Sequence, residues 1–360
     1  MGEERAVKRF DTQYLTERVN ETIQSLLKEL IENTPDTLKV YSQEFAKFTL
    51  RPGKRIRPLL LLLTYYGYLI STDDESDKRA YMLAGILEIM HAFLLVHDDV
   101  IDESSLRRGE PTLHKIYEQL TGSEKIGKDL AIVVGDIASF YYFGKLSDLV
   151  GFGIEKEPFQ KLLKLFADCY VRTGYGQLLD ILFTGNVTES ALRDDIPTHI
   201  SLYKTAYYTF VYPMLFGYYL ASGQETEEAR KLQQIGEKVG IAFQYRDDIL
   251  GTFGGDTKSA NDILEGKATI LVKRTMDNLA EDEKEKFLGL INKKDKSESD
   301  IETIKSYMLK SGALNETIKD VTKLVTEALS ILAVLKMDTY YKAEIEKIFR
   351  KVLDIPKVAF

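Results

Sequence analysis

The chain has 360 residues and a formal net charge of −8, with 44% hydrophobic and 29% charged residues. This composition supports a sizeable core, and the acidic balance argues against non-specific binding to nucleic acid. The lone Cys169 excludes an internal disulfide framework and a multi-cysteine metal site. The N-terminal stretch MGEERAVKRFD has no apolar core and is not a signal peptide. We therefore expect a cytoplasmic protein.

Helical periodicity runs through almost the whole chain. Residues 10–33 carry apolar side chains at a spacing of three and four, and a break follows at 33–36. The segment RPGKRIRP at 51–58 is predicted to be a loop, because prolines stand near both of its ends. A short buried helix at 58–70 and a long apolar helix at 78–104 come next. Further helices are expected at 124–150, 156–184, 197–222, 225–252, 266–280, 282–292, 298–311 and 314–353.

The longest uncharged run, at 205–223, approaches the length of a membrane span. It contains several tyrosines and Pro213, and there is no second run of this kind, so we interpret it as a buried helix and expect no membrane span. No series of strands and no linker is apparent, and several helices are apolar nearly all round, as in the centre of a bundle. The sequence therefore predicts one all-α domain over residues 1–360.

Two acidic clusters each follow an apolar helical run. In HDDVID at 97–102, Asp98 and Asp102 are four residues apart and share one helix face. Such carboxylates repel each other unless a hard cation lies between them, and Mg²⁺ is commonly held by one or two carboxylates together with substrate phosphates. FQYRDD at 243–248 supplies a second pair, Asp247 and Asp248. The two clusters suggest two walls of one cavity; the alternative is two solvated helix ends.

Basic residues gather near both acidic clusters. The 51–58 loop contains four cationic side chains around Gly53, which lets the backbone approach a ligand closely, and Arg107 and Arg108 follow the first acidic cluster. In isolation the loop could equally be a solvated basic turn. There are more cationic side chains than one diphosphate group would require, so we interpret them as binding two anionic substrates. No GxxxxGK[ST] motif is present, which disfavours P-loop phosphoryl transfer.

In this order, the motifs GKRIRP (53–58), HDDVID (97–102), RR (107–108), GYGQLLD (174–180), YKT (203–205), FQYRDD (243–248) and EGKAT (265–269) resemble the trans-isoprenyl diphosphate synthase (polyprenyl synthetase) family. The resemblance covers most of the chain. It implies the isoprenoid synthase fold, which is a single large bundle of long, mostly antiparallel helices around a deep central cavity, in a homodimer. The substrates it implies are isopentenyl diphosphate and an allylic diphosphate (dimethylallyl, geranyl or farnesyl).

The resemblance also implies a role for each motif residue. Three Mg²⁺ ions per active site, replaceable by Mn²⁺, would be bound by Asp98, Asp102 and Asp247, with Asp99, Asp248, Gln177 and Asp180 in support. Isopentenyl diphosphate would be held by Lys54, Arg57, His91 and Arg108. The allylic diphosphate would be held by Arg107, Lys204, Thr205, Gln244, Lys258 and Lys267. For His91 the alternative is a satisfied core histidine, and for Gln177 and Asp180 it is a buried polar pair.

Two departures from the family pattern concern the second acidic motif. Gly251 stands where the family commonly has a third aspartate, and Thr257 stands where a glycine commonly precedes the lysine. The loop at 252–263 is also shorter than usual. We expect Asp247 and Asp248 to suffice.

The expected reaction is ionisation of the allylic diphosphate followed by attack of the isopentenyl double bond. Phe93 and Leu94 lie five and four residues before Asp98. In the family, an aromatic at the fifth position alone, with an uninserted DDxxD, is typical of archaeal-type C20 enzymes. Geranylgeranyl diphosphate is therefore the predicted product, with farnesyl diphosphate as the alternative. A class I terpene cyclase or a non-catalytic subunit of a heteromeric synthase is disfavoured, because the second diphosphate pocket and both acidic motifs are retained.

Overall fold

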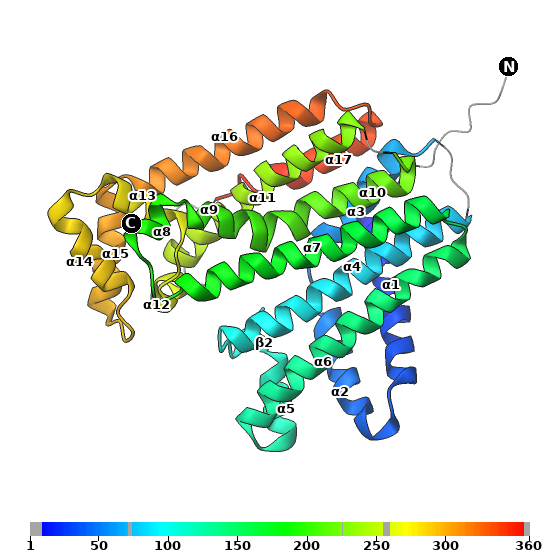
Figure 1. Cartoon of the computed structure of the whole chain (residues 1–360), viewed down its shortest axis with the longest axis horizontal. Coiled ribbons are helices and arrows are strands. Elements are labelled where there is room, and N and C mark those ends of the chain that lie inside the picture. The colour runs from blue at the N-terminus through cyan, green and yellow to red at the C-terminus, as the bar shows by residue number, and fades with distance from the viewer. Residues whose placement is uncertain (1–8, 71–73, 225, 255–259, 356–360) are drawn as a thin grey trace. The chain divides into compact units, whose positions relative to one another are not determined.

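The computed structural model describes residues 9–70, 74–224, 226–254 and 260–355 (Figure 1). The chain divides into two compact units. The first comprises Met1–Leu163 with Gly217–Gly223, and the second comprises Lys164–Phe216 with Gln224–Phe360. The helices α7 and α10 each contribute to both units, so the division does not follow a linker.

The first unit is built from long helices and one very short hairpin. In chain order its elements are α1 (Thr12–Asn33), η1 (Asp36–Leu38), α2 (Lys39–Leu50), α3 (Ile56–Tyr68), α4 (Asp74–Ile101), β1 (Leu106–Arg107), β2 (Glu110–Pro111), α5 (Leu113–Thr121), α6 (Glu124–Lys145), η2 (Leu146–Phe152) and the start of α7 (Lys156–Phe183). The strands β1 and β2 pair antiparallel, and η1 and η2 are 3₁₀ turns.

Helix α4 is the centre of the first unit. It contacts α1, α3 and α6, and α6 also lies beside α5 (Figure 1). Every residue from Ala80 to Ala92 is buried, which explains why this stretch is apolar on all sides rather than along one stripe. Of the periodic apolar positions of α1, Leu15, Val19 and Ile23 are fully buried, whereas Tyr14 is 43% exposed. A rigid central helix thus carries the first acidic motif at its C-terminal end.

The second unit is also helical. Its elements after α7 are α8 (Glu189–Arg193), α9 (Ile196–Ile200), η3 (Ser201–Val211), α10 (Tyr212–Ser222), α11 (Glu227–Phe253), α12 (Asn261–Glu265), α13 (Ile270–Asn278), α14 (Glu281–Ile291), α15 (Glu298–Lys310), α16 (Ala313–Ala333) and α17 (Thr339–Arg350). Within this unit, α11 lies between η3 and α16 (Figure 1).

The element η3 is a π-helix, and the backbone N–H of Tyr212 bonds to the carbonyl of Tyr207, five residues earlier. Helices of this type are rare in proteins, and those that do occur often lie at functional sites. Two glycines of α11 let it approach η3 closely. A Cβ on Gly236 would lie 2.7 Å from Val211 Cα, and one on Gly240 would lie 2.3 Å from Ala206 Cα. Side chains larger than hydrogen cannot be accommodated there without displacing η3.

The all-α prediction is confirmed, and the expected helices are present with some differences. The sequence pattern did not predict α2, α5, α8 and α12 or the β1–β2 hairpin. It predicted one helix over 197–222, where the structure has α9, the π-helix and α10 in succession. The helix expected at 314–353 is interrupted between α16 and α17. The single domain and the central cavity stay predictions.

Two described helical segments are long and apolar enough to cross a membrane. The first, Asp74–Ile101, has 78% of its most apolar window buried inside the protein, as a core helix does. The second, Glu124–Phe152, has 33% of its window buried. The uncharged run at 205–223 is not among them, and its described residues are mostly buried in η3 and α10.

Candidate active site

The first acidic cluster lies on the last turns of α4. The backbone N–H of Asp102 bonds to the carbonyl of Asp98 at 2.8 Å, so the two carboxylates do share a helix face. Asp99 is fully buried, and Arg107 donates to its Oδ1 from Nε at 2.7 Å and from Nη2 at 2.6 Å. Arg107 Nη2 also lies 3.6 Å from Asp98 Oδ2. Asp99 therefore ties the basic pair to the acidic motif.

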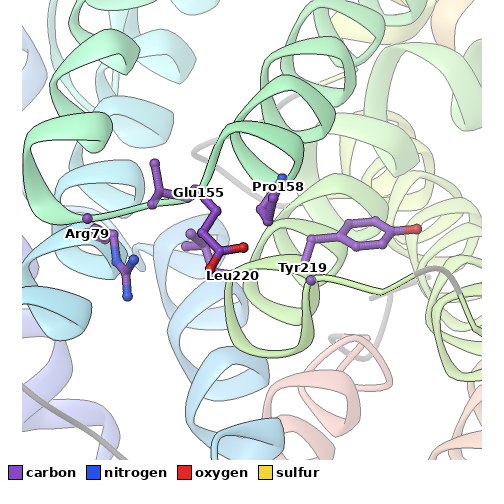
Figure 2. Close-up of a pocket in the computed structure, with 8 residues that line it drawn as sticks. Arg79, Glu155, Pro158, Tyr219 and Leu220 are labelled. Atoms are coloured by element: carbon purple, nitrogen blue, oxygen red, sulfur yellow. The ribbon is translucent and has the colours of Figure 1, made fainter.

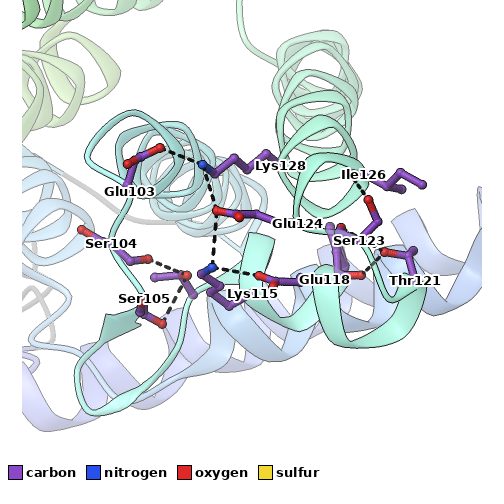
Figure 3. A network of polar contacts seen from close by, with 12 residues as sticks. Glu103, Ser104, Ser105, Lys115, Glu118, Thr121, Ser123, Glu124, Ile126 and Lys128 are labelled. Carbon is purple, nitrogen blue, oxygen red and sulfur yellow. Dashed lines mark hydrogen bonds and ion pairs between the residues drawn. The ribbon is translucent and has the colours of Figure 1, made fainter.

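A chain of ion pairs holds the segment that follows α4 (Figure 3). Lys128 of α6 bonds to Glu103 at 2.8 Å and to Glu124 at 3.2 Å, and Lys115 of α5 bonds to Glu118 at 2.8 Å. The hydroxyl of Thr112 donates to the Ser104 carbonyl at 2.8 Å. Glu103 and Glu124 are exposed and the other charged side chains are only partly buried, so each pair contributes little to stability. Together they fix both ends of the segment that carries Arg107 and Arg108.

The basic loop and the β1–β2 hairpin are bound to each other. Arg51 lies 3.1 Å from the Glu110 carboxylate and donates to the Pro111 carbonyl at 2.8 Å. Arg108 Nη1 donates to the Pro52 carbonyl at 2.6 Å. A Cβ on Gly53 would lie 2.7 Å from that Nη1 atom, so the end of the Arg108 side chain lies directly against the loop backbone and would have to shift if Gly53 were replaced. The structure thus brings GKRIRP and Arg108 into one basic surface.

Within this loop the cations differ in their surroundings. Arg55 is 5% exposed and bonds to Glu88 at 2.9 Å and to Asn20 at 3.0 Å, so it is a core residue. Lys54 is exposed and Arg57 is half-buried. The backbone at Arg55 and Arg108 lies in the left-handed region, with φ of 48° and 57°, which is uncommon for side chains other than glycine and occurs often at binding sites.

His91 is buried on α4, beneath this basic surface. Burial lowers its pKa well below the ordinary value, and the charges of Arg57, Arg108, Arg107 and Arg55 lower it further. The imidazole is therefore neutral at pH 7 and can donate one hydrogen bond and accept another. Phe93 and Leu94 follow it on the same helix and are both partly exposed.

In the second unit, the π-helix presents Lys204 to α7. Lys204 Nζ bonds to Asp180 Oδ2 at 2.5 Å. A Cβ on Gly176 would lie 2.1 Å from the backbone nitrogen of Lys204, so this glycine lets α7 and η3 approach closely. Gln177 is half-buried, and its Nε2 atom has no hydrogen-bond partner among the described residues. Lys204 and Asp180 are thus neighbours, and Asp180 pairs with a cation that the sequence did not predict as its partner.

A row of hydrogen bonds connects η3 with the second acidic motif. Thr205 donates to Gln244 Oε1 at 2.6 Å, and Gln244 Nε2 donates to Asp248 Oδ1 at 2.8 Å. Asp248 Oδ2 accepts from the backbone N–H of Ile270 at 3.2 Å. Burial and the nearby carboxylate of Asp262 raise the pKa of Asp248 to about 8. Asp248 is thus buried and accepts a hydrogen bond on each oxygen, whereas Asp247 is half-buried, with its Oδ1 3.8 Å from Arg246 Nη1.

Asp262 is a residue that the sequence analysis missed. A Cβ on Gly251 would lie 2.2 Å from Asp262 Oδ2, so the carboxylate of Asp262 covers the position where the family commonly has a third aspartate. The signal was the departure at Gly251 itself, because a glycine in a buried helix marks a close approach by another group. Asp262 comes from α12, so the sequence spacing alone could not identify it.

Two lysines were predicted to follow the second acidic motif, Lys258 and Lys267. Lys267 lies 2.8 Å from Glu265, next to α12. Lys258 and Thr257 lie outside the described residues.

The first pair of carboxylates fits a hard divalent cation that substrate oxygens also bind. Asp98 and Asp102 offer hard oxygen donors on adjacent turns, and the chemistry of this donor set suits Mg²⁺. Among the described residues, no group of three or more His, Cys, Asp or Glu side chains is close enough to enclose a metal ion. The donor set therefore matches Mg²⁺ that shares its coordination with phosphate oxygens, and it does not match a closed protein cage.

One pocket in the first unit lies apart from all of these residues (Figure 2). Its volume is about 250 Å³, with Arg79 at one end and Tyr219 at the other. Glu155 and Pro158 also line it, and none of the predicted site residues does. The predicted site residues of the first unit therefore lie outside this pocket.

The sequence profile of the polyprenyl synthetase family matches residues 38–308. The chain is 34% identical over 300 residues to a geranylgeranyl diphosphate synthase of Saccharolobus solfataricus, covering 80% of this chain and 81% of that protein. It is 30% identical over 317 residues to a geranylfarnesyl diphosphate synthase of Aeropyrum pernix, covering 86% and 92%. A solved geranylgeranyl pyrophosphate synthase of Corynebacterium glutamicum, complexed with isoprenyl diphosphate and magnesium, matches with a TM-score of 0.83 at 26% identity, covering 96% and 99%.

These findings confirm the isoprenoid synthase fold and the resemblance drawn from the motifs. The chain belongs to the polyprenyl synthetase family. It is a prenyltransferase of the short-chain isoprenyl diphosphate synthase class.

Proposed function

We propose that the protein is a cytoplasmic, homodimeric geranylgeranyl diphosphate synthase that condenses isopentenyl diphosphate with allylic diphosphates. The observation that carries the C20 product is the pair of residues before the first acidic motif. Phe93 is aromatic and Leu94 is aliphatic, and the motif has no insertion. The similarity to geranylgeranyl and geranylfarnesyl diphosphate synthases supports a product of this size over farnesyl diphosphate.

The basic surface of the first unit is the proposed site for isopentenyl diphosphate. Lys54 and Arg57 supply charge, Arg108 is already oriented across Gly53, and neutral His91 can donate to a phosphate oxygen without adding to the repulsion among the arginines. Arginine forks suit diphosphate because they can bind two oxygens at once. Arg55 is excluded from this role because its side chain is buried against Glu88.

The allylic diphosphate is proposed to bind Arg107, Lys204, Lys258 and Lys267. Asp98, Asp102 and Asp247 would hold Mg²⁺, up to three ions, with Mn²⁺ able to replace it. When bound, the metal stabilises the negative charge that develops on the departing diphosphate. Lys204 is held in place by Asp180, so its ammonium is preorganised for the same charge. Thr205 and Gln244 are joined by a hydrogen bond and are proposed to orient the reacting carbon.

The growing chain is proposed to run along α4 toward its N-terminus. At a rise of 1.5 Å per residue, Phe93 is roughly 7–8 Å deeper than Asp98 along the helix axis. A phenyl ring at that depth can block further elongation. The alternative is that Phe93 only packs against a neighbouring helix and that the cavity ends elsewhere.

A homodimer is supported by an exposed apolar face on α6. Val133, Ile137 and Phe140 are 53%, 49% and 77% exposed, and they recur at helical spacing. Contiguous apolar surface of this kind usually marks an interface.

The product can be identified directly. The purified protein is incubated with labelled isopentenyl diphosphate, Mg²⁺ and one of the three primers, and the dephosphorylated products are separated by chromatography. A C20 product is expected, and none with EDTA or in the Asp102→Asn variant. A main product of C15 would support the farnesyl alternative, and full turnover in EDTA would contradict the proposed metal role.

A further inference from the structure

His97 is the first residue of the HDDVID motif, on α4 between Phe93 and Asp98, and no role has been given to it so far. Its ring meets the ring of Phe93 edge to face, with centroids 5.5 Å apart and planes at 88°. On its other side, His97 Nε2 lies 3.1 Å from the carbonyl oxygen of Ile132 on α6. Because a carbonyl only accepts, Nε2 must carry the proton and donate. The imidazole therefore connects Phe93 to the backbone of a second helix.

The His97 ring packs against the backbone of α6 at Gly135, and this contact is called its seat below. A Cβ on Gly135 would lie 2.5 Å from His97 Nε2 and 2.8 Å from its Cδ2, so the imidazole occupies the space that any other side chain would fill. Asp136 Oδ1 lies 3.6 Å from Nε2 and adds a carboxylate oxygen to the same nitrogen's surroundings. The seat and the hydrogen bond together leave the ring little freedom to turn.

An imidazole held in one orientation also restricts the side-chain rotamers of Phe93. A helical side chain chooses among few rotamers, and an edge-to-face contact with a fixed ring favours one of them. The height at which a phenyl ring closes a channel depends on that rotamer. A phenyl ring without the support could swing aside for part of the time and let a longer chain pass.

We propose that His97 is a positioning residue that sets product length by holding the Phe93 ring, with Gly135 as its seat. This proposal rests on the proposed function, in which Phe93 ends the cavity. The role of His97 is a separate claim from the proposed function, because Phe93 alone could block the growing chain in whatever rotamer its side chain adopts. His97 itself touches neither the substrate nor the metal in this proposal.

Two variants remove the support by different routes. His97→Leu removes the donor and the ring edge, and Gly135→Ala forces the imidazole off its seat while leaving His97 and Phe93 in the sequence. The matched control is Gly144→Ala, because it lies on the same helix and a Cβ there meets nothing within 4 Å. Thermal unfolding shows whether each variant folds, and Gly135→Ala carries the test if His97→Leu does not fold.

The readout is the product distribution with isopentenyl diphosphate and farnesyl diphosphate. Both support variants should increase the fraction of products beyond C20 by roughly fivefold or more, while Gly144→Ala keeps the wild-type distribution. The double variant Phe93→Ala/His97→Leu should give the same products as Phe93→Ala, because His97 acts through Phe93.

The outcomes separate the two proposals. If Phe93→Ala lengthens the product while both His97→Leu and Gly135→Ala keep C20, the role of His97 is refuted and the proposed function stands. If the double variant makes products longer than those of Phe93→Ala, His97 lines the cavity itself and the positioning role is refuted. If Phe93→Ala leaves product length unchanged, Phe93 does not end the cavity, and both the chain-length assignment and this inference fail.

Discussion

Adjacent side chains of the basic loop have different surroundings and therefore different roles. The sequence identified the loop as cationic and the resemblance singled out Lys54 and Arg57. It could not show that Arg55 is a core residue, because its partner Glu88 is 33 positions away and only the tertiary structure brings them together. The same holds for Asp262, whose contact with the Gly251 position depends on the packing of α12 against α11.

Substitution of the loop cations Lys54 and Arg57 should change different kinetic constants from substitution of Lys204. Lys54→Ala or Arg57→Ala should raise KM for isopentenyl diphosphate roughly tenfold or more, because each removes a charge-assisted hydrogen bond. Lys204→Ala should instead raise KM for the allylic substrate and lower kcat. Steady-state kinetics with each substrate varied in turn measures both effects.

Lys47→Ala is the control for lost charge, since Lys47 is an exposed cation of neighbouring α2 that pairs with Glu44. If Lys54→Ala leaves both KM values unchanged, the loop is only a solvated basic turn.

His91 should make stability depend on pH below neutrality. Its pKa in the folded protein is lowered by burial and by the arginines, so below pH 6.5 the unfolded chain binds a proton that the folded protein does not. Stability should therefore fall as the pH drops below 6.5, by on the order of 1 kcal/mol per pH unit at most for this group. Urea unfolding of wild type and His91→Gln at pH 7.5, 6.0 and 5.0 measures the difference.

The variant should lose less stability than wild type between pH 7.5 and 5.0. It should not become independent of pH, because burial also lowers the pKa of His114. Parallel pH profiles for the two proteins would show that His91 is protonated as readily in the folded protein as in the unfolded one.

Elements are positioned by close backbone approaches that a sequence pattern does not reveal. Apolar periodicity located nearly all the long helices, because a buried helix face requires apolar residues at a spacing of three and four. It could not distinguish the π-helix η3 from an α-helix, since eleven residues are too few to separate the two periods. The short α5 and the β1–β2 hairpin were missed because packing of α5 against α6 and the contact of Arg51 with Pro111, and not a long periodic pattern, hold them.

Gly176 should be essential to the geometry of η3. In Gly176→Ala the added methyl would lie 2.1 Å from the backbone nitrogen of Lys204, and backbone cannot move aside as a flexible side chain does. The variant should lose about 1–3 kcal/mol of stability from overpacking and lose activity through displacement of Lys204. Denaturant unfolding and kcat with saturating substrates measure the two effects.

Gly174→Ala is the matched control, two residues away on α7, where an added Cβ meets nothing within 4 Å. It should keep wild-type activity and gain up to about 1 kcal/mol from helix propensity. Equal behaviour of the two variants would mean that α7 and η3 are not in close contact in solution.

For the whole molecule, the fold class followed from the sequence, because an all-helical pattern without strands leaves few alternatives. The number of compact units was harder to predict from the sequence than the fold class. The chain divides into two compact units, and two of the three points at which it passes from one unit to the other lie inside α7 and α10, where no linker in the sequence marks them. The proposed dimer likewise depends on which helix faces remain exposed, which a sequence does not show.

The exposed face of α6 should be required for self-association. Phe140→Glu places a charge at its most exposed position and should convert a dimer into a monomer with the 41.0 kDa mass of the chain. Ile70→Glu is the control, because Ile70 is 93% exposed at the end of α3. Light scattering coupled to size exclusion gives the masses; a Phe140→Glu protein that remains dimeric would place the interface elsewhere.

The π-helix also makes the length of segment 201–211 a constraint on how this enzyme can evolve. A substitution changes one side chain, but loss of a single residue here would let the backbone return to ordinary α-helical bonding and would turn Lys204 by about 100° relative to Tyr212. Insertions and deletions should therefore be excluded from this segment, while exposed loops such as 293–297 can change length freely. An alignment that opens a gap between Lys204 and Tyr212 would indicate a relative with a differently built reaction centre.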